Sequence, residues 1–397
     1  MPTVMISCGE PSGDLYAGAL AREIQALRPG TRVVGFGGEH LRSAGADLVG
    51  DYRGLTVTGL VEALRVLPRA FSMQRALVAQ ARRERPDALV AIDFPDFNFR
   101  LADTLHRLGV PVVYYICPQI WAWRPGRLRT LKRLVDHALV IFPFEEPIYR
   151  EAGVKVDFVG HPLLDLAVPQ VSRAAFLSEL GLAADAPTIA LLPGSRPNEL
   201  REIVPTLAAA VPLIASRLDR AQFILARAPH LPDRLLAPLA ALTAPRVAMV
   251  AGRTDDVLAA SDVVVTASGT ATVQAAIHER PMVIVYRLSP LTYRLGKPLV
   301  KVDTFGMVNL VAGERLAPEL IQDAFTPDAV AAETVRFFTD PAYAARTREG
   351  LRAVRRKLGT AGASRRAAEH VLAVCDRPGD ASSGIMVRSL FRGTPNS

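Results

Sequence analysis

The chain has 397 residues, half of them apolar, and its lysines and arginines exceed its aspartates and glutamates by 47 to 39. This length is more than one hydrophobic core usually fills, so two domains are expected. Three cysteines, an odd number at wide spacing, favour a reducing cytosol over a disulfide framework or a zinc site. The excess of basic residues favours phosphate-rich or anionic-lipid partners. The base content of the genome, which favours arginine and alanine codons, explains this excess equally well.

The N-terminal apolar run, residues 3–8, is short and has neither a basic start nor a small-residue cleavage site, so no secretion signal is expected. No later run reaches the roughly 18 apolar residues that a membrane-spanning helix needs. We therefore expect a soluble or peripheral membrane protein.

Short apolar runs alternate with helix-length amphipathic stretches along most of the chain. The runs are residues 4–6, 33–36, 88–92, 110–116, 138–142 and 156–159, and then 188–192, 223–226, 247–250, 263–266 and 283–286. This rhythm is typical of doubly wound, mostly parallel sheets, in which ligands bind beyond the carboxyl ends of the strands. It predicts two Rossmann-like α/β domains facing across a cleft.

We place the first domain at residues 1–165 and the second at residues 166–375. The residues from Pro327 onward are expected to be helical, with the last helices free to cross back to the first domain. Residues 376–397 are expected to form a disordered tail.

The turn Gly9-Glu10-Pro11-Ser12-Gly13-Asp14 lies between the first predicted strand and the first predicted helix. Its glycines permit a tight turn, and free helix amides at such a place can receive an anion or a polar headgroup. An ordinary helix cap at Ser12 explains the pattern at least as well.

Asp93 follows the run 88–92, at the predicted carboxyl end of a strand, where chemistry on such sheets usually occurs. Flanking apolar residues would remove water from its carboxylate, raise its pKa and suit it to general-base catalysis. A helix cap is the structural alternative, and we expect that role for Asp96 instead.

Residues 118–124 place both tryptophans of the chain beside Arg124. Trp123 and its neighbours suit a sugar or a lipid interface, with Arg124 facing a phosphate, although one indole packing in the core is nearly as good an explanation. His161, between the two halves, is expected to be structural or to position substrate rather than to act as the base.

Two strand–turn–helix segments in the second half, residues 192–196 and 266–272, can present backbone amides to a diphosphate, with Arg196 adding a guanidinium fork. A plain turn with Arg196 in water is the alternative. The second half has no Asp-x-Asp pair, so helix ends and arginine, rather than a metal, would carry the charge of a leaving diphosphate.

Residues 55–77 mix apolar side chains with arginines, namely Leu60, Val61, Leu64, Val66, Leu67 and Phe71 with Arg65, Arg69 and Arg75. This stretch is similar to an interfacial patch that inserts apolar side chains while arginine meets lipid phosphate. A buried helix with a solvated face explains it almost as well.

Taken in order, these motifs resemble those of the lipid-A-disaccharide synthase family up to about residue 375. The matching segments are residues 9–14, 92–98, 118–124, 142–145, 160–162, 192–196, 268–270 and 309–313. The resemblance implies a GT-B fold and an inverting, metal-independent transfer of 2,3-diacylglucosamine from UDP to 2,3-diacylglucosamine 1-phosphate, with a β-1′,6 link in the product. It also implies a homodimer on the inner face of the cytoplasmic membrane and no cofactor.

By this resemblance Asp93 is the candidate base, and Arg196 and Asn309 are further candidate catalytic residues. The candidate substrate-binding residues are Glu10, Ser12, Gly13, Trp123, His161, Ser195, Ser268, Gly269, Thr270 and Gln274.

Gln274 is a departure, because GT-B enzymes that use UDP-sugars usually carry a glutamate there that binds the ribose hydroxyls. A glutamine lacks the charge assistance of a carboxylate, and Glu279 or Glu314 are neighbours that would compensate.

Two alternatives remain open from sequence. One is another metal-independent GT-B enzyme that uses UDP-N-acetylglucosamine, such as a 2-epimerase. The other is a non-catalytic nucleotide-binding peripheral membrane protein on the same scaffold. Nucleic acid is not an expected partner, because no basic run is interleaved with stacking aromatic residues.

Overall fold

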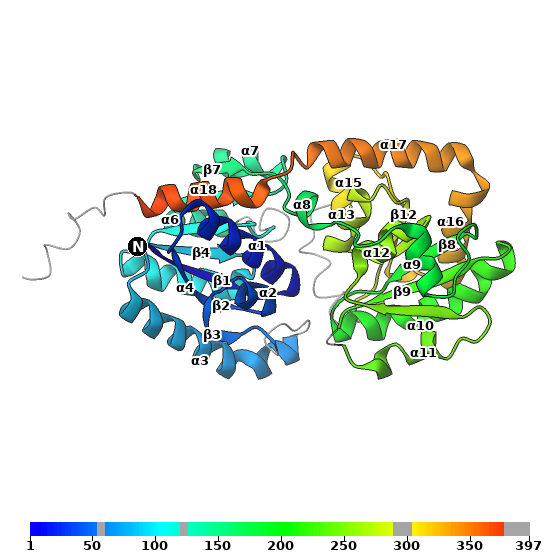
Figure 1. The fold of residues 1–397 in the computed structure, drawn as a ribbon, viewed down its shortest axis with the longest axis horizontal. Coiled ribbons are helices and arrows are strands. Elements are labelled where there is room, and N and C mark those ends of the chain that lie inside the picture. The colour runs from blue at the N-terminus through cyan, green and yellow to red at the C-terminus, as the bar shows by residue number, and fades with distance from the viewer. Residues whose placement is uncertain (54–59, 120–125, 230, 289–303, 377–397) are drawn as a thin grey trace, which may run out of the picture.

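The computed structural model describes residues 1–53, 60–119, 126–229, 231–288 and 304–376, with backbone alone at residues 60–65. Two parallel sheets, each covered by helices, lie side by side along the long axis of the molecule (Figure 1). The predicted fold class, two Rossmann-like α/β domains of GT-B type, is confirmed. The proposed boundary near residue 165 remains a prediction.

The first sheet has seven strands in the order β3-β2-β1-β4-β5-β6-β7, all parallel. Its strands are β1 Thr3–Cys8, β2 Arg32–Gly37, β3 Asp47–Asp51, β4 Ala88–Ile92, β5 Val112–Tyr115, β6 His137–Val140 and β7 Val156–Phe158. Its helices are α1 Pro11–Leu27, α2 Glu39–Ser43, α3 Leu60–Glu84, α4 Pro95–Arg107, α6 Arg127–Leu134 and α7 Glu145–Glu151. Every residue of β4 is buried, as expected where helices cover both faces of a parallel sheet.

The second sheet has six parallel strands in the order β10-β9-β8-β11-β12-β13. They are β8 Thr188–Leu192, β9 Gln222–Arg227, β10 Val247–Ala251, β11 Val263–Ala267, β12 Met282–Tyr286 and β13 Glu319–Ile321. The helices between them are α10 Pro197–Arg217, η1 Asp233–Leu235, α11 Ala237–Ala240, α12 Thr254–Ala260, α13 Thr270–Ile277 and α15 Met307–Ala312, and η3 Gln322–Ala324 follows the last strand. Two short helices, α8 Leu163–Leu166 and α9 Arg173–Glu179, lie on the connection between the sheets.

The C-terminal helices join the two halves. After α16 Pro327–Thr339, helix α17 Pro341–Lys357 runs along the second half, and α18 Ala363–Cys375 returns to pack on α1 of the first (Figure 1). Arg28 at the end of α1 forms a two-pronged ion pair with Asp376, with contacts of 2.7 and 2.6 Å. One buried apolar cluster therefore continues from the first sheet through α18 into α13 of the second half.

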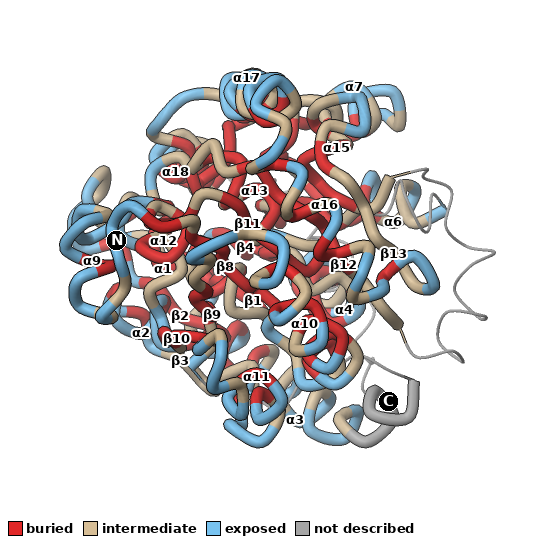
Figure 2. Tube along the Cα trace, turned by 90° about the vertical axis from the view of Figure 1, so that its right-hand side faces the viewer, coloured by how far each residue is buried: buried red, intermediate tan, exposed pale blue. Residues whose placement is uncertain are grey.

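Buried backbone runs through the strands, while the outer surfaces of the surrounding helices are exposed (Figure 2). The ends of β4 and β5 face the ends of β8 and β11, so their following turns meet between the two sheets. Among the described residues, no helix is both long enough and apolar enough to cross a membrane.

Candidate active site

Two adjoining pockets, with volumes of about 430 and 350 Å³, open between the sheets. We name them by the roles that the sequence predicts: the acceptor-side pocket is lined by the ends of β4 and β5 together with Phe142 and Glu145, and the nucleotide-side pocket by the ends of β8 and β11. Glu10, Tyr16 and Arg196 line both pockets, so the two form one continuous cleft.

The cleft brings together nearly all the predicted site residues. The acceptor-side pocket contains Glu10, Ser12, Gly13, Asp93, His161, Arg196, Gly269 and Thr270. The nucleotide-side pocket contains Glu10, Ser12, Ser195, Arg196, Ser268, Gly269, Thr270 and Gln274. Trp123 lies outside the described residues, and Asn309 lines neither pocket.

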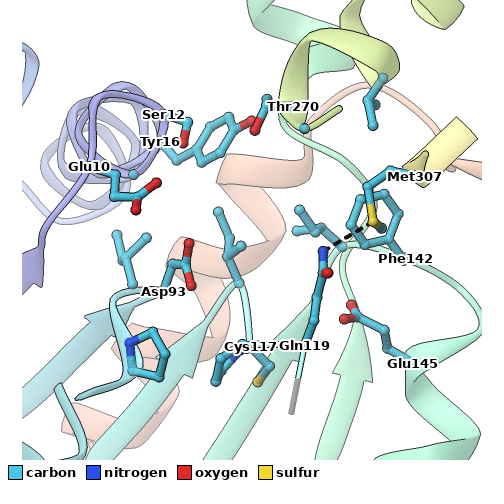
Figure 3. Close-up of a pocket in the computed structure, with 18 of the residues that line it drawn as sticks. Glu10, Ser12, Tyr16, Asp93, Cys117, Gln119, Phe142, Glu145, Thr270 and Met307 are labelled. Carbon is cyan, nitrogen blue, oxygen red and sulfur yellow. Dashed lines mark hydrogen bonds between the residues drawn. The ribbon is translucent and has the colours of Figure 1, made fainter. Parts of the chain in front are cut away.

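Asp93 stands directly after β4, and its carboxylate projects into the acceptor-side pocket below Glu10 (Figure 3). Burial raises the pKa of Asp93 to about 7, and the charge of Glu10 acts in the same direction. A hydrogen bond from the Phe94 backbone amide and the charge of Arg196 oppose this rise. A carboxyl group with this pKa is partly ionised near neutral pH and can accept a proton from a bound hydroxyl.

Asp96 does not cap helix α4, contrary to expectation. Phe94 occupies the N-cap position in a left-handed conformation, and Asp96 lies in the first turn of the helix. The Asp96 carboxylate pairs instead with Arg127, which also lines the acceptor-side pocket.

An ion pair between Glu10 and Arg196 crosses the cleft. Arg196 precedes α10 in the second half, and its Nη2 donates to both Glu10 carboxylate oxygens at 2.8 and 2.7 Å. Arg196 Nη1 also donates to Glu199 at 3.0 Å. Because Nη2 is already engaged by Glu10, a phosphate that reaches this guanidinium fork would have to take the place of the Glu10 carboxylate, for which it offers equivalent acceptors.

The turn before α10 differs from the expectation that its amides receive a diphosphate. The carboxylate of Glu199 already accepts from the backbone amides of Ser195 and Arg196, at 3.1 and 3.2 Å. Gly194 has a φ of 116°, and a Cβ there would lie 2.4 Å from a Glu199 carboxylate oxygen. This turn therefore contributes the Arg196 side chain to the cleft, while Glu199 satisfies its amides.

The second helix start, at α13, faces both pockets. The amide of Ser268 donates to Val285 of β12 at 3.1 Å, and its hydroxyl donates to the Phe305 carbonyl at 2.8 Å. Gly269 is the N-cap residue and Thr270 begins the helix, so their amides point outward at the positive end of the helix dipole. This start is the better placed of the two for an anion.

Gln274, on α13, donates from Nε2 to Asp255 at 3.0 Å, and His278 contacts the same carboxylate oxygen at 3.0 Å. A carboxylate only accepts hydrogen bonds, so this contact leaves the Gln274 carbonyl oxygen as an acceptor for a ligand. Glu279 forms ion pairs with Arg352 and Arg355, while Glu314 is exposed. Neither of these two glutamates lines the nucleotide-side pocket.

His161 is buried against Tyr16 and Phe142, with ring centroids 6.1 and 5.3 Å away. Its burial lowers its pKa to about 3, so the ring is neutral at physiological pH and a poor base. Its Nδ1 accepts from the Leu163 amide at 3.2 Å, which places the proton on Nε2. His161 can therefore donate one hydrogen bond to a substrate in the acceptor-side pocket.

Asn309 lies on helix α15 and ties it to the segment that leads into β13. Its Nδ2 donates to the Ala317 carbonyl and to Glu319 at 2.9 and 2.8 Å, and its Oδ1 accepts from the Ala317 amide at 2.9 Å. Only 1% of the residue is exposed. Its neighbour Met307, on the same helix, reaches the acceptor-side pocket, so any effect of Asn309 on the cleft would pass through α15.

Some residues of the motif at residues 9–14 line the cleft, and others stabilise the fold. Glu10 is the N-cap residue of α1, and Ser12 in the first turn lines both pockets, so Ser12 is not the cap. Asp14 is buried, and it accepts from the amides of Gly38, His40 and Leu41 at 2.7, 2.9 and 3.1 Å. Asp14 therefore holds the start of α2.

Several residues that line the acceptor-side pocket received no role from sequence, among them Tyr16, Gln119, Glu145 and Met307. Gln119 and Met307 meet across the cleft, with a Nε2–Sδ distance of 3.1 Å (Figure 3). Tyr16 lies one helical turn after Ser12, so helical spacing would have identified it. The other three come from segments that only the fold brings together.

Among the described residues, one cluster has the residue types for a metal ion: His137, Asp157 and His370. His137 Nε2 and Asp157 are 2.5 Å apart, and His370 comes from α18. None of the three lines either pocket, so the cluster lies apart from the cleft chemistry.

Solved structures with the same architecture include a UDP-GlcNAc 2-epimerase from Neisseria meningitidis bound to UDP-GlcNAc, with a TM-score of 0.66 and 12% identity. The match covers 94% of this chain and all of that one. The glycosyltransferase of kitacinnamycin matches with a TM-score of 0.63 and 21% identity, over 94% of this chain and 98% of that one. Such distant likenesses establish the fold alone.

A sequence model of the family described as lipid-A-disaccharide synthetase matches residues 4–373. The lipid-A-disaccharide synthase of Geobacter sulfurreducens is 45% identical over 372 residues, which cover 93% of this chain and 96% of that protein. The synthase of Myxococcus xanthus is 41% identical over 371 residues, covering 94% and 97%. The chain therefore belongs to the lipid-A-disaccharide synthase family of glycosyltransferases.

Proposed function

We propose that this chain transfers 2,3-diacylglucosamine from UDP to the 6-hydroxyl of 2,3-diacylglucosamine 1-phosphate. The transfer inverts the anomeric carbon, forms a β-1′,6 link and releases UDP. One observation carries the proposal: a single cleft joins a carboxyl group whose pKa is raised to about 7 to a pocket with an arginine and an open helix start.

The UDP moiety would occupy the nucleotide-side pocket. Its diphosphate would meet Arg196 and the amides of Gly269 and Thr270, which are donors already oriented toward the place where charge develops. The Gln274 carbonyl, held by Asp255, would accept from a ribose hydroxyl. These groups neutralise the leaving diphosphate through hydrogen bonds and a helix end.

Asp93 would take the proton of the acceptor. The 6-hydroxyl oxygen attacks the anomeric carbon, its proton moves to the Asp93 carboxylate, and the bond from that carbon to the diphosphate oxygen breaks. UDP departs with the bonding electron pair. His161 would donate from Nε2 to substrate in the same pocket, which fits its neutral ring.

Helix α3 would hold the protein at a membrane surface. Leu67 and Phe71 are 36% and 45% exposed, and Arg100 lies over the Phe71 ring with its guanidinium carbon 5.3 Å from the centroid. Arg69 and Arg75, also exposed, would meet lipid phosphate. The side chains of Leu60, Val61 and Leu64, expected in the same patch, lie outside the described residues.

The membrane proposal is tested by sedimentation with vesicles that contain phosphatidylglycerol. Phe71→Ser should reduce the bound fraction, because one exposed ring contributes to insertion. Leu108→Ser is the matched control, because Leu108 is also 45% exposed but lies at the far end of α4. Equal binding by the wild type and by Phe71→Ser would remove α3 as the contact.

The homodimer implied by the family resemblance and the location on the inner face of the cytoplasmic membrane are also proposals. Light scattering of the full chain in detergent tests the first, and cell fractionation tests the second.

The reaction is tested in detergent micelles with purified protein, UDP-2,3-diacylglucosamine and 2,3-diacylglucosamine 1-phosphate, following UDP and the disaccharide by mass. Equal amounts of the two products are expected, and a parallel reaction with UDP-N-acetylglucosamine alone tests epimerisation. Epimer formation without disaccharide would replace the proposal with the 2-epimerase reaction.

A further inference from the structure

Asp93 and Phe94 are two successive non-glycine residues in the left-handed region, with φ of 42° and 48°. Residues other than glycine rarely adopt this backbone conformation, and it persists only where the surrounding structure fixes it. The strain lies directly beneath the carboxylate that faces the acceptor-side pocket (Figure 3).

Asn98, on the first turns of α4, is fully buried behind this bend. Its Nδ2 donates to the Asp93 carbonyl at 2.8 Å and lies 3.2 Å from the carbonyls of Ile92 and Ser7. Its Oδ1 accepts from the Ser7 hydroxyl at 2.7 Å. Because carbonyls only accept, these contacts fix which end of the amide faces the bend.

Tyr114, on the neighbouring strand β5, is also fully buried, and its hydroxyl donates to the same Asp93 carbonyl at 2.8 Å. The Asp93 amide donates to the Ile116 carbonyl at 3.2 Å. Both ends of the Asp93 backbone are therefore fixed, and two side chains share its carbonyl.

Gly9 leaves room for the bend from the other side. A Cβ on Gly9 would lie 2.1 Å from the Phe94 ring, which stacks on Phe97 with centroids 5.3 Å apart. Any side chain at position 9 would therefore push Phe94 out of the bend.

We propose that Asn98 and Tyr114 are positioning residues that hold the Asp93 carboxylate in its reactive orientation, by clamping the Asp93 carbonyl from behind the cleft. Neither residue lines a pocket, so each acts through Asp93 without contacting substrate. The inference rests on the proposed role of Asp93 as the base. Fixing a catalytic group within a fraction of an ångström is what catalysis by orientation requires.

The test is a double-mutant cycle in the micelle assay. Tyr114→Phe removes the hydroxyl and keeps the ring, so the fold should persist. We expect kcat to fall about 3- to 10-fold, the usual cost of one hydrogen bond, with KM for the UDP-sugar unchanged. In an Asp93→Asn background the same change should have almost no further effect, because its partner no longer acts as a base.

Tyr149→Phe is the matched control. Tyr149 is equally buried, on helix α7 of the same half, and its hydroxyl donates to the Pro118 carbonyl at 2.7 Å. It does not contact Asp93 through this hydroxyl, so its effect on turnover should be the same in both backgrounds. Asn98→Ala tests the other half of the clamp. If that variant does not fold, Ser7→Ala serves instead, because it removes one hydrogen bond that holds the Asn98 side chain.

A Tyr114→Phe variant with wild-type kcat, or with an equal loss in both backgrounds, would overturn the positioning role and leave Asp93 as the base. Near-normal turnover by Asp93→Asn alone would remove the proposed base, and the inference with it. The two failures are therefore distinguishable.

Discussion

The two sides of the cleft hold their polar groups by different means. On the acceptor side, non-glycine residues adopt left-handed conformations at the ends of neighbouring strands, at Asp93 and Phe94 after β4 and at Ile116 after β5. On the nucleotide side, the positive φ values fall on glycines, at Gly194 and Gly269. Among the described residues that line the cleft, the non-glycine positive φ values therefore fall on the side that carries the Asp93 carboxylate.

The difference matches the two chemical tasks. A proton acceptor must be fixed and partly dehydrated, whereas a diphosphate is bound by several donors that tolerate small displacements. The Glu10–Arg196 ion pair connects the two sides, because each residue lines both pockets. Substitutions on the acceptor side should therefore reduce turnover, and those on the nucleotide side should reduce affinity for the UDP-sugar.

The largest effect is expected from Asp93→Asn, which removes the proton acceptor and keeps the shape. Turnover should fall by about two to four orders of magnitude, the usual scale of acid–base help, while the Kd for UDP stays within twofold. Asp103→Asn on the same helix is the control, because Asp103 pairs with the surface residues Arg107 and Arg133 in the described part of the chain. Weaker UDP binding by Asp93→Asn would contradict the assignment of turnover to the acceptor side and of nucleotide affinity to the other.

Arg196→Ala should act mainly on the nucleotide side. Loss of charge-assisted hydrogen bonds worth about 1.5–3 kcal/mol predicts a KM for the UDP-sugar that rises about 10- to 100-fold. Arg201→Ala, one turn further along α10 and exposed, is the matched control for charge. An unchanged KM with a lower kcat would place Arg196 on the chemical step instead.

Asn309→Ala should chiefly reduce stability. It leaves the buried Ala317 amide without its acceptor and Glu319 without one donor, at a cost of about 1–3 kcal/mol. Thermal unfolding should show a lower Tm, together with a modest loss of turnover. A normal Tm with turnover as low as that of Asp93→Asn would instead give Asn309 a direct catalytic role.

Glu10→Gln should have the smallest effect, seen in the pH dependence. Asp93 must be ionised to accept a proton, so kcat/KM should rise with pH through about 7. The Glu10 charge raises the pKa of Asp93, so its removal favours the ionised form and moves this rise to lower pH, by up to about one unit. A shift of this rise to higher pH would show that the charge of Glu10 does not raise the pKa of Asp93.

Apolar rhythm predicted the architecture because parallel strands buried on both faces read as continuous apolar runs. The two strands missed are edge strands. Asp47–Asp51 has acidic ends and a glycine, and Glu319–Ile321 has only three residues. Val156–Phe158 and Val247–Ala251 also lie at sheet edges and were predicted, so the two misses reflect acidic composition and short length rather than edge position.

The structure places in the cleft the residues that the sequence singled out directly after a strand, such as Asp93, and at the start of a helix, such as Thr270, while their roles remain predictions. Site prediction could not foresee that Glu199 satisfies the amides beside Arg196, because that contact depends on a side-chain rotamer. Nor could it identify the pairing of Glu10 with Arg196, which lie 186 residues apart and meet only when both halves are in place.

The most direct test of the account is the pH dependence of kcat/KM for the wild type and for Asp93→Asn, measured in the same micelles from about pH 5 to 9. For the wild type, we expect the logarithm of kcat/KM to rise with pH at a slope of about one, to bend near pH 7 and to level above it. The residual kcat/KM of Asp93→Asn should lack that rise. A wild-type rate that is flat across this range, or an Asp93→Asn rate that keeps the same rise, would show that another group takes the proton.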